Sequence, residues 1–348
     1  MGDEYFTSYS DLDVHRLMLT DEPRMKSYKN AIDSNKDIFQ NKVVMDVGSG
    51  TGVLAIMCAQ AGAKKVYAVE ASDIAKLSEK LVKENNVSDI VQVFNTRVED
   101  LDLPDNQKVD IIVSEWMGFY LLHEGMLDSV LVARDKFLKL GGRMFPEIAA
   151  LYASPCSLPD LYKFWTDVSG INLSVFGNEL RKSKSNQPDV ALVNAEDLLS
   201  EPVCVFELNL RTLQTEELNK FSCSRVVCAN KDGLYQGLCI WFTCTFPSPI
   251  ITDQLVLSTA PFSQPTHWKQ TVIVLPDEYA VEEREPLAWE INLTRSDENP
   301  RHYNIQLTML DPEKVAHAVP CNCYMTKCIV SRTFLECEGE PGDIIDMT

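Results

Sequence analysis

Glu115 and Glu124 flank a short loop that follows the apolar run 109–113. Two carboxylates held close together can bind both edges of a planar guanidinium through paired, charge-assisted hydrogen bonds. The two glutamates are nine residues apart, so one helix face does not bring them together. Only a hairpin-like loop would make them converge. We therefore expect a loop that presents both carboxylates to an arginine side chain.

A glycine turn lies upstream, after a short apolar strand and before the helical run 53–61. Gly48, Gly50 and Gly52 let the backbone approach a ligand closely. The pattern G-x-G-x-G differs from the G-x-G-x-x-G of dinucleotide sites. Asp46 would oppose a phosphate at this helix start and suits a cation. S-adenosylmethionine, which carries an ammonium and a sulfonium but no phosphate, fits these features, and a nicotinamide dinucleotide is the alternative.

Two further acidic positions follow the next predicted strands. Glu70 ends the second strand, where an acid can accept hydrogen bonds from both ribose hydroxyls. Val98 and Glu99 come after the third strand, 90–94, and are placed to meet an adenine edge. A solvated surface charge is the alternative for Glu99, because exposure is the ordinary state of an acidic side chain.

The elements that must position these residues alternate between strand and helix as far as residue 146. Such alternation predicts a parallel sheet with crossovers on both faces, the α/β Rossmann-like class. We expect a polar helical segment at 1–35 and the sheet domain at 36–146. The expected strands are 42–47, 65–69, 90–94 and 109–113, and the expected helices are 53–61, 73–86 and 125–140, the last one ended by Gly141-Gly142.

The pattern changes after Phe145-Pro146, and the region 147–348 is expected to be a mostly-β domain. Apolar residues alternate with period two in runs such as 203–210 and 236–246, as in an antiparallel barrel or sandwich. An aromatic-rich excursion, about 158–190, interrupts this pattern early. It either meets a partner surface or caps its own core.

The acidic composition narrows the class of partner. The chain has 348 residues and a formal net charge of −19. DNA and RNA backbones favour clusters of Lys and Arg, so nucleic acid is not expected as a direct partner. An acidic surface favours basic partners such as arginine-rich protein tails, although acidity can also serve solubility alone. No apolar run approaches the ~20 residues of a membrane helix, and no signal peptide is recognisable, so no membrane is expected.

The eleven cysteines indicate reduced, intracellular thiols, because their number is odd and no export signal is recognisable. We expect the protein in the cytoplasm, the nucleus or both. The closely spaced cysteines are Cys223 with Cys228, Cys239 with Cys244, and Cys321, Cys323 and Cys328. The first two pairs fall in strand-like runs with looser spacing than zinc ribbons, and the third group gives no stronger indication. The sequence therefore predicts no metal.

The chain resembles the protein arginine methyltransferases over nearly its whole length. The residues that carry the resemblance are Tyr5-Phe6 and Tyr9, His15 and Met18, Asp21 and Arg24, the glycine loop, Glu70, Val98-Glu99, Ser114-Glu115-Trp116-Met117-Gly118, Glu124-Gly125-Met126 and Thr266-His267-Trp268. The paired glutamates and the Thr-His-Trp segment are the most specific of these. The resemblance implies a Rossmann-like domain followed by a β-barrel, a dimerisation arm at about 158–190, and a homodimer.

The resemblance also implies roles for single residues. The expected cofactor-binding residues for S-adenosylmethionine are His15, Arg24, Asp46, Gly48, Gly50, Gly52, Glu70, Val98 and Glu99. Arg24 would pair with the cofactor carboxylate, and His15 would lie over the cofactor. The expected catalytic residues are Glu115, Glu124, Asp21 and His267, and the expected substrate pocket residues are Met18, Met126 and Trp268. Core packing is the alternative for both methionines, and a buried structural histidine is the alternative for His267.

The implied reaction is methyl transfer to an arginine nitrogen. Arginine is protonated at neutral pH and its lone pairs are delocalised, so it is a poor nucleophile. Two carboxylates draw positive charge toward the nitrogens they contact, and one terminal nitrogen regains electron density. Positioning can supply up to about 7–11 kcal/mol of the barrier reduction. A carboxylate, or Asp21 with His267, would pass the departing proton to water.

Two last predictions concern the methylated product and a position at which the chain departs from the family pattern. Met18 and Met126 match the asymmetric-dimethylating subgroup, so monomethyl and asymmetric dimethyl products are expected. The family usually has two acids where this chain has Arg16-Leu17, and the alternative is a weakly active or inactive paralogue that acts as a dimerising scaffold. A methyltransferase for a small molecule is disfavoured, because a neutral acceptor would leave two buried carboxylates unpaired.

Overall fold

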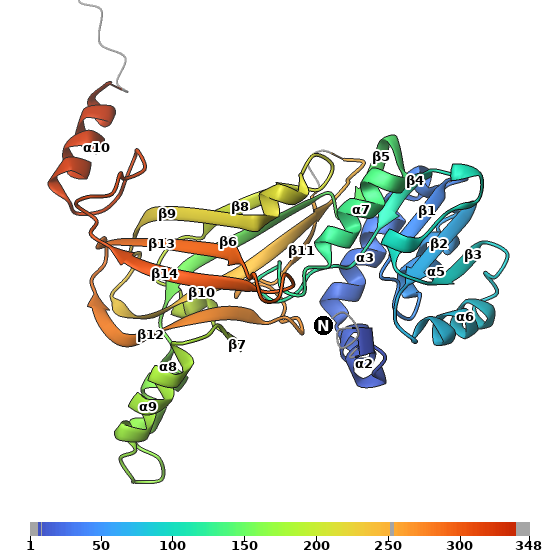
Figure 1. Cartoon of the computed structure of the whole chain (residues 1–348). Helices are drawn as coiled ribbons and strands as arrows, with labels where there is room; N and C mark the ends of the chain where they lie inside the picture. The colour runs from blue at the N-terminus through green and yellow to red at the C-terminus, as the bar shows by residue number, and fades with distance from the viewer. Residues whose placement is uncertain (1–5, 8, 251–253, 339–348) are drawn as a thin grey trace, which may run out of the picture.

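The computed structural model describes residues 6–7, 9–250 and 254–338 (Figure 1). The chain begins with helices that precede the sheet domain: α2 (Leu12–Thr20), α3 (Glu22–Ser34) and α4 (Lys36–Phe39). Asp21 ends α2 and caps α3, because its Oδ1 accepts a hydrogen bond from the backbone N–H of Arg24 at 3.0 Å. Pro23 in the first turn has a φ that suits a helix start. Helices α2 and α3 thus occupy much of the described part of the segment for which we expected helix.

The first domain is a parallel sheet with the strand order β3-β2-β1-β4-β5. Its strands are β1 (Val43–Val47), β2 (Lys65–Glu70), β3 (Val91–Asn95), β4 (Val109–Val113) and β5 (Leu138–Phe145), and its helices are α5 (Val53–Gln60), α6 (Ala75–Glu84) and α7 (Leu127–Phe137). The chain reverses its direction of progress across the sheet between β1 and β4. In open α/β sheets, ligands bind outside the carboxyl ends of the strands at this reversal. The loops after β1 and β4 are the glycine loop and the Glu115 loop.

One predicted element is wrong at its end. The helix expected over 125–140 ends at Phe137, and Leu138–Phe145 forms β5 beside β4. Gly141 has φ +77° and the register shifts within this strand pair, so the glycines belong to an irregular edge strand instead of a helix stop. The edge strand is largely exposed and shows no apolar alternation, which is why the sequence pattern did not reveal it.

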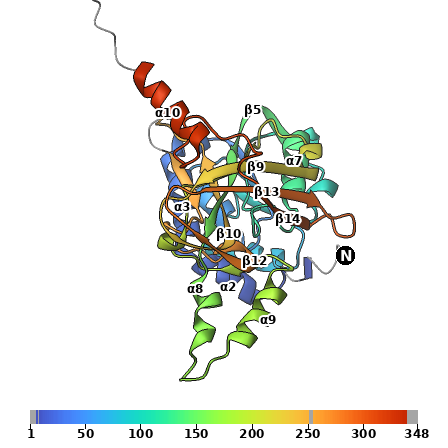
Figure 2. The same ribbon diagram turned by 90° about the vertical axis from the view of Figure 1, so that its left-hand side faces the viewer.

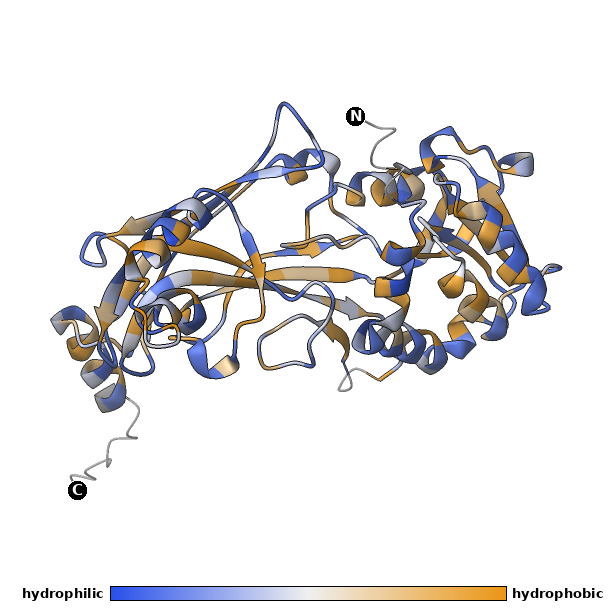
Figure 3. Cartoon of the chain, turned by 90° about the horizontal axis from the view of Figure 1, so that it is seen from below, coloured by the Kyte–Doolittle hydropathy of each residue, from blue (hydrophilic) through white to orange (hydrophobic). Residues whose placement is uncertain are grey.

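The second domain is antiparallel and barrel-like. One sheet has the order β7-β12-β10-β6-β8, with β11 paired to β10, and a smaller sheet has the order β14-β13-β9. The strands are β6 (Ile148–Cys156), β7 (Asp189–Ala191), β8 (Val203–Asn209), β9 (Lys220–Cys228), β10 (Gly233–Phe246), β11 (Leu255–Ser258), β12 (Gln270–Val281), β13 (Pro286–Arg295) and β14 (Tyr303–Leu310). Figure 3 shows apolar strands inside the domain and hydrophilic loops around it.

The excursion expected at 158–190 is a helical arm. It contains α8 (Pro159–Tyr162), a 3-10 turn at Phe164–Thr166 and α9 (Ser174–Lys184). The arm projects from the β domain in two perpendicular views (Figures 1 and 2). Gly177 allows its two limbs to pack tightly, since a Cβ there would lie 2.8 Å from Trp165.

The two domains share a hydrophobic core, and α3 lies between them (Figure 1). Tyr28 of α3 packs against Phe246 of β10 with ring centroids 4.9 Å apart. Asn35 donates a hydrogen bond from Nδ2 to the carbonyl of Pro247 at 2.7 Å. The hydroxyl of Tyr28 also donates to the carbonyl of Ser114, just after β4, at 2.9 Å, so α3 is held against both domains.

The chain after β14 forms a loop and the helix α10 (Thr326–Glu338), at the end of the β domain that is farthest from the parallel sheet (Figure 1). Among the described residues, no helix has the length and apolar character that crossing a membrane requires.

Candidate active site

A cavity of about 380 Å³ lies at the carboxyl ends of β1 and β4. Its wall combines segments far apart in the sequence, namely α2, α3, the glycine loop, the loop after β4 and the turn before β12. The predicted residues that line it are His15, Met18, Arg24, Gly48, Gly50, Glu70, Val98, Glu99, Glu115, Glu124, Met126, His267 and Trp268. The fold therefore brings the nucleoside-type residues and the paired glutamates into one space.

The glycine loop forms a backbone cradle on one side of the cavity. Gly48 and Gly50 have φ values of +68° and +53°, which L side chains rarely adopt. A Cβ at Gly48 would lie 2.1 Å from the methyl carbon of Met126, and one at Gly50 would lie 3.2 Å from the ring of His15. His15 and Met126 therefore cover the glycine loop, and only glycine leaves room beneath them.

Glu70 is buried at the tip of β2 beside this cradle. One of its carboxylate oxygens accepts a hydrogen bond from the N–H of Gly50 at 2.8 Å, and the other accepts from Ser72 at 2.7 Å. A carboxylate offers about four lone-pair sites, so both oxygens can accept further hydrogen bonds from hydroxyl groups.

Asp46 and Gly52, both predicted to bind the cofactor, do not line this cavity. The Asp46 side chain is fully buried beneath the loop, and its Oδ2 accepts from the N–H of Ala55 at 3.0 Å. Its Oδ1 has no hydrogen-bond partner among the described residues. Burial raises the pKa of Asp46 to about 7, because the ionised form is desolvated. Asp46 therefore places a carboxyl group, either ionised or protonated, directly beneath the glycine loop.

Val98 and Glu99 form a short 3-10 turn that also lines the cavity. Val98 is buried and presents an apolar surface. Glu99 accepts a hydrogen bond through Oε1 from the hydroxyl of Ser129 at 2.6 Å. Ser129 lines the cavity as well, and it was not among the predicted residues.

The loop after β4 is the hairpin-like turn that convergence of the glutamates requires. Gly118 and Leu121 exchange backbone hydrogen bonds of 3.1 and 3.0 Å. A Cβ at Gly118 would lie 2.2 Å from the carbonyl oxygen of His123, so the turn needs glycine there. Glu124 has φ +75°, an unfavourable value for a residue with a side chain, and it sits where the chain returns to the cavity.

Glu115 forms a buried ion pair with Arg24 of α3. Oε2 of Glu115 lies 2.9 Å from Nε and 2.8 Å from Nη2 of Arg24, and the two side chains are 8% and 7% exposed. Burial opposes the charge on Arg24, but Glu115 more than offsets this and raises the pKa of the guanidinium. The carboxylate thus binds a guanidinium edge in this structure.

Glu124 accepts a hydrogen bond from the hydroxyl of Tyr9 at 2.5 Å. Its backbone carbonyl accepts from Nη1 of Arg301 at 2.7 Å, and Arg301 also lines the cavity. Arg301 lies 177 residues further along the chain, in the turn before β14. No local sequence signal pointed to it, since only the closed fold brings this turn to the loop.

His267 contacts Asp21 as expected. Its Nδ1 lies 2.6 Å from Oδ2 of Asp21, and its backbone N–H donates to the same oxygen at 2.8 Å. Burial opposes ionisation of Asp21, but the hydrogen bonds from His267 lower the pKa of its carboxyl below the ordinary value. Trp268 is buried and donates from Nε1 to the carbonyl of Met117 at 2.9 Å, which ties this turn to the Glu115 loop.

The position of Arg16-Leu17 bears on the departure from the family pattern. Arg16 is on the outer face of α2, where its exposed side chain pairs with Asp13 at 3.0 Å. Leu17 is 54% exposed but also contributes to the cavity wall. The departure therefore changes the surface of α2 and one apolar wall residue, and the polar contacts of the site do not depend on it.

Comparison with known proteins identifies this arrangement. Residues 147–310 match the arginine methyltransferase oligomerization subdomain, and residues 30–123 match the ribosomal protein L11 methyltransferase family. Protein arginine N-methyltransferase 6 of Danio rerio is 43% identical, over 90% of this chain and 91% of that protein. A probable protein arginine N-methyltransferase 6.1 of Oryza sativa is 40% identical, over 87% of this chain and 84% of that protein.

The chain belongs to the protein arginine methyltransferase family. Solved members of the family share its fold. The Arabidopsis thaliana protein arginine methyltransferase 10 superposes with a TM-score of 0.78 at 34% identity, covering 88% of this chain and 94% of that one. A PRMT6–SAH structure gives 0.75 at 32% identity, covering 86% and 100%. The Rossmann-like domain with a following β-barrel, and the class of methyltransferase, are thus confirmed.

The cavity fits S-adenosylmethionine, the cofactor of this family. Three features suit a nucleoside with a cationic methionine part. The glycines have no room for a Cβ, Glu70 at the tip of β2 can accept further hydrogen bonds, and Oδ1 of Asp46 beneath the cradle has no hydrogen-bond partner among the described residues. When bound, this group supplies an electrophilic methyl on sulfur. The roles of single residues remain predictions that the contacts above support.

Proposed function

We propose that this protein transfers methyl groups from S-adenosylmethionine to guanidino nitrogens of arginine residues in proteins, giving monomethyl- and asymmetric dimethylarginine. The observation that carries the proposal is the turn at Gly118–Leu121, which returns Glu124 to the cavity that Glu115 also lines. Two carboxylates in one partly dry space require a cationic acceptor, since a neutral one would leave buried charges unpaired.

The glutamates would act by orienting and polarising the acceptor. Glu115 binds the edge of a guanidinium in the present structure, so its geometry already suits this group. Glu124 offers a second carboxylate once its hydrogen bond from Tyr9 is released. Together they would concentrate positive charge on the contacted nitrogens and fix one terminal nitrogen for in-line attack.

The proton that leaves the acceptor needs a path to water. His267 lines the cavity, and its contact of 2.6 Å with the buried Asp21 holds the imidazole in one orientation. The His267 side chain is 13% exposed, so it bridges the pocket and solvent. This pair would relay the proton after the methyl group has moved.

Asymmetric dimethylation is supported by the shape of the wall. Met18 and Met126 both line the cavity, and Met126 packs onto Gly48. Their bulk would restrict the free nitrogen of a monomethylated arginine, so that the second methyl goes to the nitrogen that already carries one.

The arm supports a homodimer. Its exposed apolar residues are Phe164, Ile171, Val175 and Phe176, with exposed fractions of 54, 60, 78 and 54%. The arm lies within residues 147–310, which match the oligomerization subdomain. A projecting element with apolar side chains on its surface is typical of an interface, because such side chains are costly to leave in water.

The test is transfer of labelled methyl from S-adenosylmethionine to an Arg-Gly-Gly peptide, followed by amino-acid analysis of the product. We expect monomethyl- and asymmetric dimethylarginine. Symmetric dimethylarginine alone would contradict the product assignment. Cofactor binding by calorimetry without transfer to any arginine peptide would favour the scaffold alternative.

A further inference from the structure

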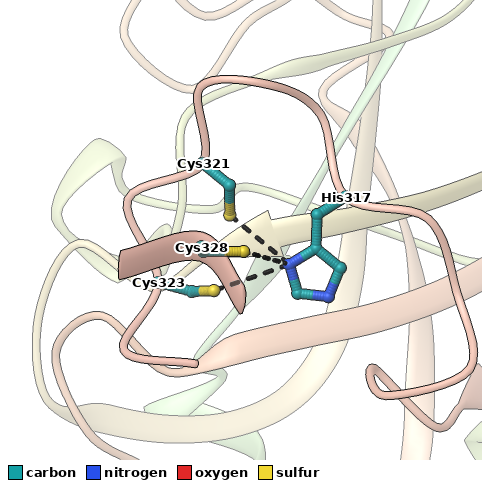
Figure 4. Close-up of side chains that lie close together, drawn as sticks. All are labelled: His317, Cys321, Cys323 and Cys328. Atoms are coloured by element: carbon teal, nitrogen blue, oxygen red, sulfur yellow. Dashed lines mark hydrogen bonds between the residues drawn. The ribbon is translucent and has the colours of Figure 1, made fainter. Parts of the chain in front are cut away.

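Three cysteines and a histidine converge after β14, outside the active site. His317, Cys321, Cys323 and Cys328 lie within twelve residues of sequence and bring their ligand atoms within 4.8 Å of one another. Figure 4 shows the three sulfur atoms directed at the same nitrogen of the His317 ring. Cys323 is fully buried and Cys328 is 5% exposed, so the group is largely shielded from solvent.

The distances match a tetrahedral metal site. The Sγ atoms of Cys321, Cys323 and Cys328 lie 3.5, 3.5 and 3.1 Å from Nδ1 of His317. Around a tetrahedral zinc ion, with Zn–S of about 2.3 Å and Zn–N of about 2.0 Å, a ligand sulfur and a ligand nitrogen are about 3.5 Å apart. The four atoms therefore need only small shifts to surround such an ion.

Hydrogen bonding alone does not account for this convergence. Nε2 of His317 lies 2.8 Å from the carbonyl oxygen of Pro312, which only an N–H can satisfy. In a neutral ring Nδ1 then has a single lone pair, which can accept a hydrogen bond from one thiol. Three sulfurs crowd this one acceptor, whereas a divalent cation would bind all four atoms together.

The surroundings also suit a metal. The contact of Nε2 with Pro312 is the outer hydrogen bond that orients a metal-binding histidine and fixes its tautomer. Arg332 donates from Nη1 to the carbonyls of Cys321 and Cys323, the latter at 3.2 Å. Its positive charge stands beside a centre that three thiolates would make anionic.

We propose that His317, Cys321, Cys323 and Cys328 bind a structural zinc ion. Three thiolates and one imidazole select a soft or borderline ion over Mg²⁺ or Ca²⁺, which prefer oxygen ligands. Four protein ligands leave no open coordination position, so the site is structural instead of catalytic. The sequence prediction missed it because Cys321-x-Cys323 does not follow the usual paired spacing, and His317 was not considered with the cysteines.

The site would fix the C-terminal module, defined here as residues 311–338, to the β domain. Cys328 lies in the first turn of α10, while His317 and Cys321 belong to the preceding loop. The loop contacts the turn before β13 through two hydrogen bonds of 3.1 Å, from Nε of Arg284 to the carbonyl of Asn322 and from the N–H of Tyr324 to the carbonyl of Arg284. The module begins directly after residue 310, where the match to the oligomerization subdomain ends.

The experiment measures metal in the full-length protein, purified with a phosphine reductant and without chelator from cells supplied with zinc. Inductively coupled plasma mass spectrometry should find about one zinc per chain. The Cys328→Ser substitution should lower the zinc content about tenfold. Cys204→Ser is the matched control, because Cys204 is a partly exposed thiol of β8 outside the cluster. It should keep the zinc content of the unchanged protein.

A second measurement does not depend on a variant that folds well. Unchanged protein stripped of metal and titrated with Co²⁺ should show sulfur-to-metal charge transfer and the intense visible bands of tetrahedral cobalt, with an endpoint at one equivalent. Chelation should also speed amide hydrogen exchange in α10 relative to β10. Zinc-free protein from zinc-supplied cells, together with an octahedral-type cobalt spectrum, would overturn the proposal. Stoichiometric copper or iron would overturn its assignment to zinc.

Discussion

Arg24 and Glu115 form a buried ion pair across the cavity, with Oε2 of Glu115 2.8 Å from Nη2 and 2.9 Å from Nε. In the proposed function each residue of this pair binds a different group. Arg24 binds the cofactor carboxylate, and Glu115 binds the substrate guanidinium. The internal pair therefore competes with both ligands until the cofactor is bound.

We predict that substrate binding depends on the cofactor. In calorimetry, an arginine peptide should bind about tenfold more tightly in the presence of S-adenosylhomocysteine than in its absence, because the cofactor carboxylate releases Glu115 from Arg24. By reciprocity, the peptide should tighten S-adenosylhomocysteine binding by the same factor. Equal peptide affinities with and without cofactor would show that the ion pair does not gate the site.

Glu124→Gln should reduce kcat/KM by about 10²–10⁴-fold, since an amide cannot balance the positive charge of the acceptor. Its melting temperature should stay close to that of the unchanged protein, because the backbone carbonyl that binds Arg301 is retained. The control is Glu207→Gln on the exposed side of β8, which should leave methyl transfer unaltered. Full turnover by Glu124→Gln would remove the basis of the proposed guanidinium site.

Asp21 has two functions that substitution can separate. Its Oδ1 caps α3, and its Oδ2 binds His267. Asp21→Ala should lose both, with a stability cost of about 1 kcal/mol from the missing cap. His267→Ala should keep the cap and lower turnover with little change in unfolding free energy. Urea unfolding and steady-state kinetics of the two variants check this; equal losses of stability would contradict it.

His123 should make the fold sensitive to acid. Burial, and then the stacked His302, lower its pKa from 6.5 to about 4, and Nδ1 lies 2.9 Å from the hydroxyl of Tyr120, which can donate only to the neutral ring. The unfolded chain binds a proton more readily than the folded one within this window. The stability from the neutral ring is therefore complete above pH 6.5 and is lost as the pH falls toward 4.

The measurement is urea unfolding between pH 4 and 7. The unfolding free energy of the unchanged protein should fall by an amount on the order of 2 kcal/mol more than that of His123→Gln over this range. Parallel pH profiles for the two proteins would show that His123 titrates alike in both states.

Substitutions in the helical arm test the proposed homodimer. Phe176→Glu combined with Val175→Glu should convert a dimer into a monomer in light scattering after gel filtration, because two charges would have to be buried at the interface. Met309→Glu, at a 41% exposed position of β14, is the control and should stay dimeric. A dimeric double variant would place the interface elsewhere.

The fold was predictable from the sequence wherever a helix or strand leaves a periodic apolar pattern. Alternating strands and helices gave the parallel sheet, and period-two runs gave the antiparallel domain, because burial of one face leaves its period in the sequence. The fifth strand, Leu138–Phe145, was missed because an exposed edge carries no such period. Its two glycines were therefore interpreted as a helix end.

The candidate site was predictable in its residues more than in its contacts. Glu115 and Glu124 follow from charge and the family pattern, but the hairpin that joins them depends on Gly118 lying against His123, which only coordinates reveal. Arg301 and the pairing of Arg24 with Glu115 depend on tertiary closure, so no spacing along the chain could have indicated them.

Glu70 and Glu124 line the same cavity. A single synthetic molecule could therefore occupy both ends, with an adenosine head joined by a short linker to a guanidine. Joining the two parts makes the second contact intramolecular, and the effective concentration can raise avidity by about 10²–10⁴-fold over either fragment. Because one cavity holds both groups of residues, the protein is a suitable target for bisubstrate inhibitors.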